Sequence, residues 1–122
     1  MSASKRVRWI SSSHKDISDF PSDVRQVMGF GLYLAQTGGK HPDAKPLQGF
    51  GGAGVLEMVD DHDGDTYRAV YTVKFDAFVY VLHAFQKKSK KGSATPQVDI
   101  ETIRRRLKMA EDDYRRRKEE AG

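Results

Sequence analysis

The segment that most constrains the fold is 66–91 (TYRAVYTVKFDAFVYVLHAFQKKSKK), which predicts two strands followed by a run of lysines. In the first strand, successive residues fall on opposite faces of a sheet, with Tyr67, Ala69, Tyr71 and Val73 on one face and Arg68, Val70 and Thr72 on the other. A guanidinium inside such a strand cannot easily reach water. Arg68 is therefore either an anion-binding residue on a sheet face or the partner of a core carboxylate, and spacing alone leaves both interpretations open.

The chain is long enough for one hydrophobic core, and we expect a single domain over residues 1–122. Because the sequence has no cysteine, it has neither disulfides nor thiolate metal sites. Its four histidines lack metal-binding spacing, so we expect no metal and no cofactor. No apolar run is long enough to cross a bilayer, and the N-terminus lacks the apolar stretch of a signal peptide. We therefore expect a cytoplasmic protein without a membrane partner.

Charge is distributed unevenly along the chain. The net charge of +4 permits a polyanionic partner. Acidic residues cluster in the segment 57–65, and lysines cluster at Lys87, Lys88, Lys90 and Lys91. The segment 60–65 (DDHDGD) does not fit the calcium-loop pattern, and its Asp-Gly pair predicts a solvated hairpin tip.

The N-terminal third predicts a strand and two helices. Residues 5–10 alternate as a first strand, and Ser13 with Asp16 resembles a capping box that starts a short helix through Phe20. Pro21 fits the first turn of a second helix, which Gly38 and Gly39 end. Apolar residues at helical spacing predict that this helix faces the core: Val24, Val27, Met28, Gly31 and Ala35.

The remainder predicts a loop, three strands and a last helix. The segment 40–54 is rich in glycine but lacks both common nucleotide-binding patterns, so we interpret it as a connector with basic side chains. Strands are expected at 55–59, 66–73 and 77–85, and a helix after Thr95-Pro96. One apolar seam runs along that helix: Ile100, Ile103, Leu107, Ala110 and Tyr114. The seam fits a core better than a homodimer, while the charged faces fit a solvated surface with a possible partner contact at the end of the helix.

This order gives an α+β layout, and two stretches carry a family resemblance. The segment 66–71 (TYRAVY), followed by 80–88 (YVLHAFQKK), resembles the RelE/ParE superfamily of bacterial toxins, and more closely its phage-derived HigB-like branch. Phe20-Pro21, Lys45-Pro46-Leu47 with Gly49, and Thr95-Pro96 support this resemblance, which spans about Val7 to Tyr114. It implies a small RelE-like fold, with an antiparallel sheet, an N-terminal helical hairpin and a C-terminal helix.

The resemblance also implies a function. Such toxins are neutralised by a cognate antitoxin, often a helix-turn-helix protein. RelE-type members cut mRNA on the ribosome, whereas ParE-type members inhibit DNA gyrase without catalysis. We predict a metal-independent mRNA endoribonuclease that acts on ribosome-bound mRNA. The alternatives are a gyrase inhibitor and an inactive prophage remnant that binds only its antitoxin.

Site residues follow from the same resemblance. Arg68 matches the strand arginine that contacts the scissile phosphate, and Lys87 matches the basic residue that stabilises the transition state or protonates the leaving oxygen. His83 has a suitable pKa for a general base, although a histidine on an apolar strand is more often a hydrogen-bonded core residue. His41 is the alternative base. Further contacts to RNA are expected from Lys40, His41, Lys45, Lys88, Lys90 and Lys91. The sequence departs from the family because it lacks the C-terminal tyrosine of RelE and the Asp-Tyr-His cluster of one HigB branch.

Overall fold

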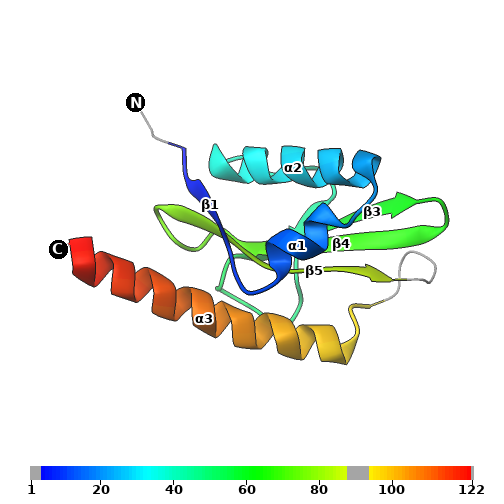
Figure 1. Ribbon diagram of the computed structural model, residues 1–122. Helices are drawn as coiled ribbons and strands as arrows, with labels where there is room; N and C mark the ends of the chain where they lie inside the picture. The colour runs from blue at the N-terminus through cyan, green and yellow to red at the C-terminus, as the bar shows by residue number, and fades with distance from the viewer. Residues whose placement is uncertain (1–3, 88–93, 122) are drawn as a thin grey trace.

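The computed structural model describes residues 4–87 and 94–121, which form a five-stranded sheet with helices on both faces (Figure 1). In chain order the elements are β1 (Arg6–Trp9), α1 (Ser13–Ser18), α2 (Ser22–Gln36), β2 (Ala44–Pro46), β3 (Val55–His62), β4 (Asp65–Thr72), β5 (Phe78–Lys87) and α3 (Gln97–Ala121). The expected α+β class and the layout of a RelE-like fold are confirmed. Within this part of the chain, no helix is both apolar and long enough to cross a membrane.

The sheet is mixed, with the order β1-β5-β4-β3-β2. The pairs β3–β4 and β4–β5 are antiparallel as expected, and β2–β3 is antiparallel too, but β1 lies parallel to β5, with Arg6 opposite Phe78. The expected antiparallel sheet is therefore mixed at this edge. The interpretation of 40–54 as a connector was also incomplete, because Ala44–Pro46 pairs with β3 as a short edge strand. A proline is tolerated there because an edge strand leaves some N–H groups unpaired.

The β3–β4 hairpin is longer than the expected strand at 55–59, since β3 continues to His62. Asp63 and Gly64 form its turn with φ values of 51° and 84°, the conformation that Asp-Gly favours in a two-residue hairpin. On the other side of β4, Val70 pairs with His83 whereas Tyr71 pairs with Val81. This β-bulge adds one residue to β5 and turns His83 toward α3, although simple alternation with Val81 would place it on the α2 side.

The helix starts differ slightly from expectation. Ser13 is the first residue of α1 rather than its cap, because its buried hydroxyl donates to the Val81 carbonyl at 3.1 Å. Ser12 takes the N-cap position, and its hydroxyl donates to Asp16 at 2.8 Å. Pro21 immediately precedes α2, close to its expected place in the first turn.

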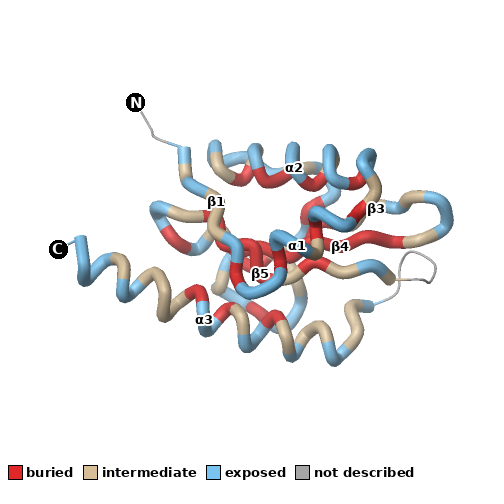
Figure 2. The backbone as a smooth tube through the Cα atoms, in the orientation of Figure 1, coloured by how far each residue is buried: buried red, intermediate tan, exposed pale blue. Residues whose placement is uncertain are grey.

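Two hydrophobic clusters bury the two faces of the sheet (Figure 2). The apolar stripe of α2 packs with α1 on one face, and the seam of α3 packs on the other through Ile103, Leu107 and Ala110. The seam is therefore core, as the sequence favoured. Because Arg68 follows the face of Val70, it points toward α3, and the site lies on this side of the sheet.

Candidate functional site

Arg68 and Glu57 form a buried ion pair beneath the start of α3. Arg68 Nη1 lies 3.3 Å from Glu57 Oε1, and the two side chains are only 5% and 11% exposed. Thr95 closes the arrangement, because its hydroxyl donates to Glu57 Oε2 at 2.8 Å and accepts from Arg68 Nη1 at 3.2 Å. Of the two interpretations of Arg68, the structure shows the core carboxylate partner. The three residues come from β3, β4 and the segment before α3, so they also fix the helix on the sheet.

This pair forms part of the wall of an open groove between the β2–β3 edge and the first turns of α3. The groove has a volume of about 520 Å³, and its lining includes Lys45, Glu57, Arg68, Thr95, Ile100 and Arg104. Lys45 is exposed on β2 directly opposite Glu57. Arg104 is exposed on α3, where its guanidinium lies 4.6 Å from the centre of the Phe50 ring. Among the described residues, Lys45, Arg68 and Arg104 thus line a groove together with the single carboxylate of Glu57, and an excess of positive charge attracts a polyanion.

A second hollow, of about 390 Å³, continues the groove along β3. It shares Lys45, Glu57 and Arg68 with the groove, and Asp43 and Asp61 line its remaining side. These two carboxylates make the hollow acidic at one end. A bound polyanion is therefore favoured on the α3 side of Lys45.

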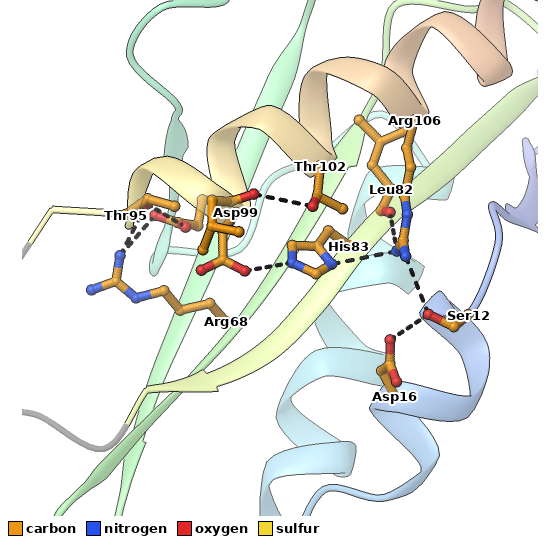
Figure 3. A network of polar contacts seen from close by, with 11 residues as sticks. Ser12, Asp16, Arg68, Leu82, His83, Thr95, Asp99, Thr102 and Arg106 are labelled. Carbon is orange, nitrogen blue, oxygen red and sulfur yellow. Dashed lines mark hydrogen bonds and ion pairs between the residues drawn. The ribbon is translucent and has the colours of Figure 1, made fainter.

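His83 occupies the same face but is engaged in a structural network (Figure 3). Its Nε2 lies 2.8 Å from Asp99 Oδ1, and its Nδ1 lies 3.4 Å from Arg106 Nη1. Because a guanidinium only donates, Nδ1 accepts, and Nε2–H therefore donates to Asp99. Arg106 also donates to the Leu82 carbonyl at 3.0 Å and to the Ser12 hydroxyl at 3.3 Å. With both ring nitrogens occupied, His83 joins β5, α3 and the start of α1.

Burial affects the guanidinium of this network. It lowers the pKa of the Arg106 guanidinium, although the nearby Asp16 carboxylate acts in the opposite direction. The side chain of His83 is only 12% exposed. To act as a general base, His83 would have to exchange its contact with Asp99 or Arg106 for one with a substrate hydroxyl.

Lys87 lies at the end of β5 on the face of Arg68, two residues beyond Phe85, which pairs with Arg68. Its ammonium donates to the Ala94 carbonyl at 2.8 Å, and Ala94 lines the groove. The structure therefore brings Lys87 to the rim of the groove. Lys88, Lys90 and Lys91 lie outside the described residues.

Lys40 and His41 are not part of this groove. Lys40 lines a hollow on the α2 side of the sheet with Leu56 and Val73. His41 packs edge-on against Phe30 of α2, and its Nδ1 accepts the Asp43 N–H at 3.0 Å. The chain crosses from one side of the sheet to the other at Ala44, so only Lys45 of the three expected loop residues joins Arg68.

Sequence reasoning missed Glu57, Thr95 and Arg104. A signal for Glu57 exists in the segment 55–59 (VLEMV), because alternation places a lone carboxylate between Val55 and Val59 on one strand face. No comparable signal marks Arg104, which is one of several arginines on α3. Its role depends on the angle at which the helix crosses the sheet.

The sequence model of the phage-derived Gp49-like protein family (DUF891) matches residues 15–108. The chain belongs to this family. Gp49-like proteins are of the toxin type found in toxin–antitoxin systems, which implies an antitoxin partner. No curated protein matches the chain.

The Gp49-like match contains the whole groove, from Lys45 of β2 to Arg104 of α3. It leaves out β1 and the last part of α3. The groove therefore belongs to the part of the fold that defines the family.

Proposed function

We propose that this Gp49-like protein is a toxin of the RelE/HigB kind that cleaves ribosome-bound mRNA without a metal ion. The observation that carries this proposal is the groove that Lys45, Arg68 and Arg104 line together with Glu57. Metal-free RNA cleavage needs fixed positive charge at the scissile phosphate and a group that accepts a proton. The groove contains both kinds of group.

In the proposed reaction the 2′-hydroxyl attacks the adjacent phosphorus and loses its proton to Glu57. The carboxylate already accepts from Arg68 and Thr95, and it retains lone pairs for a further contact. The exposed side chains Lys45 and Arg104 bind the phosphate oxygens and stabilise charge on the phosphorane. Arg68 already donates to Glu57 and Thr95, so in this scheme its role is to hold Glu57 and to add positive charge in the wall of the groove.

The leaving 5′-oxygen needs a proton, and Lys87 at the rim of the groove supplies it in this scheme. The products are a 2′,3′-cyclic phosphate and a 5′-hydroxyl, which balances the two proton transfers. His83 anchors α3 rather than acting as the base, because both its nitrogens are engaged. Lys40 and His41 have no part in the proposed reaction.

The test is induction of the chain in a bacterium, with growth as the readout. Lys45→Ala combined with Arg104→Ala should abolish growth arrest, since both cations are removed from the groove and neither is buried. Arg105→Ala combined with Lys108→Ala is the matched control, because it removes the same charge from exposed positions of α3 outside the groove. We expect the control to arrest growth like the parent. Arrest by a folded, normally expressed groove variant contradicts the proposal, and DNA damage with intact messages supports gyrase inhibition instead.

A further inference from the structure

A second cationic cleft lies at the other end of α3, between that end and the edge strand β1. It has a volume of about 540 Å³, and its lining includes Lys5, Arg6, Arg8, Asp76, Phe78 and Arg117. Among the described residues, the arginines Arg6, Arg8 and Arg117 line this cleft beside Asp76, and Asp113 pairs with Arg8 and Arg117. Figure 1 shows β1 and the C-terminal part of α3 on the same side of the molecule, away from the start of α3. Arg104 and Arg117 are separated by about 20 Å of helix, so the cleft is separate from the groove.

Arg8 and Arg117 are held in a fixed arrangement in this cleft. Their Nε atoms approach the same oxygen, Asp113 Oδ2, at 3.3 and 2.8 Å. Their guanidinium carbons lie 5.6 and 5.8 Å from the centre of the Phe78 ring. The two side chains are therefore oriented by one carboxylate and one aromatic ring before any ligand binds.

The outer ends of these two guanidinium groups remain available. Over residues 4–87 and 94–121, no hydrogen bond involves the Nη atoms of Arg8 or Arg117. Asp113 is already saturated, since it also accepts from the Tyr80 hydroxyl at 2.6 Å and from Arg116 at 2.9 Å. The planar Nη pairs match the spacing of two oxygens on one phosphate.

We propose that this cleft binds the phosphodiester backbone of single-stranded RNA at a point remote from the groove. The Arg8 and Arg117 side chains are 37% and 38% exposed, and a single-stranded nucleic acid can use such guanidinium groups in two ways, because bases stack on their planes while phosphates pair with their charge. An acidic protein segment would use the charges but not the stacking surfaces. The cleft lies mainly outside residues 15–108, so the Gp49-like match does not account for it. The proposed binding of RNA in this cleft does not depend on RNA cleavage in the groove.

The test measures binding of a short fluorescent oligouridylate with 2′-O-methyl groups, which cannot be cut and so separates this site from the proposed reaction. Arg8→Gln with Arg117→Gln should weaken binding about tenfold. It should also flatten the slope of log K against log salt by about 1.4, at about 0.7 per phosphate contact. Arg115→Gln with Lys118→Gln is the matched control, because it removes the same charge from exposed positions of α3 that do not line the cleft. We expect the affinity of this control variant for the oligonucleotide to change less than twofold.

An equal loss in both double variants, or an unchanged salt slope, overturns the proposal. If the Arg8/Arg117 variant does not fold, Arg6→Gln replaces it, since Arg6 is an exposed residue of the cleft, and its slope should change by about 0.7. An Arg6 variant that binds as the parent does is likewise a refutation. Displacement of the RNA by poly-glutamate at equal charge would instead assign the cleft to an acidic protein segment.

Discussion

Replacing Arg68 with alanine should destabilise the fold more than the same replacement at an exposed arginine would. The change leaves the Glu57 carboxylate, 11% exposed, without its guanidinium. Removing one partner of a buried ion pair costs about 3–5 kcal/mol. For 122 residues the unfolding entropy is about 0.26 kcal/mol/K, so the melting temperature should fall by about 12–20 °C.

Thermal unfolding followed by circular dichroism, together with urea titration, measures this loss. A double variant, Arg68→Met with Glu57→Leu, is the informative control because it removes both charges at once. Such apolar replacements of a buried pair are often neutral or stabilising, so the double variant should unfold within about 1 kcal/mol of the parent. If Arg68→Ala alone melts within about 4 °C of the parent, the pair is not desolvated and the reasoning is refuted. The result also decides whether a loss of toxicity in Arg68→Ala reports chemistry or unfolding.

Three further predictions concern stability. Gly31→Ala should lower the free energy of unfolding by about 1–3 kcal/mol, because the new Cβ meets the Met58 sulfur. Gly29→Ala on the same helix places its Cβ in open space and should be stabilising. Equal urea midpoints for the two variants would contradict this prediction. Tyr71→Phe should be neutral or stabilising by about 1 kcal/mol, since the Tyr71 hydroxyl is buried without a partner among the described residues. Tyr80→Phe loses the hydrogen bond to Asp113 and should be destabilising. A Tyr80→Phe variant that is more stable than Tyr71→Phe would refute this prediction. Burial alone would raise the pKa of the Asp113 carboxyl. The hydrogen bonds from Tyr80 and Arg117, with the positive charges of Arg117 and Arg8, outweigh burial and hold this pKa below its ordinary value of 3.8. The contribution of the Asp113 carboxylate to stability is therefore present above about pH 4 and is lost as the pH falls through its folded-state pKa. Asp113→Asn should lessen the fall in unfolding free energy that acid causes. An Asp113→Asn variant with the pH profile of the parent would contradict this prediction.

Much of the fold could be predicted because local patterns and global packing agree. The alternation in 66–73 fixed the faces of β4, and the seam of α3 fixed its buried side. The parallel pairing of β1 with β5 could not be read, because it joins segments far apart in the sequence and no turn signal links them. The bulge at His83 was also invisible, since it depends on the register between two strands rather than on either strand alone.

The candidate site was predictable only in part. Arg68, Lys45 and Lys87 do reach one face, because alternation and strand order determine that. Lys40 lies on the opposite side of the sheet, and the chain's crossing at Ala44 leaves no mark in the sequence. Arg104 enters the groove through the crossing of α3 over the sheet, a tertiary property that helical spacing does not contain.

The most direct test of the central proposal is to map 5′ ends on an abundant translated message after inducing this chain alone. Primer extension should show new ends inside the reading frame with the parent and with the Arg105/Lys108 control. It should show none with the Lys45/Arg104 variant, because the groove has then lost the two exposed cations that bind the phosphate in this scheme. Messages that stay intact while the parent arrests growth, or identical new ends from the groove variant, would contradict the account.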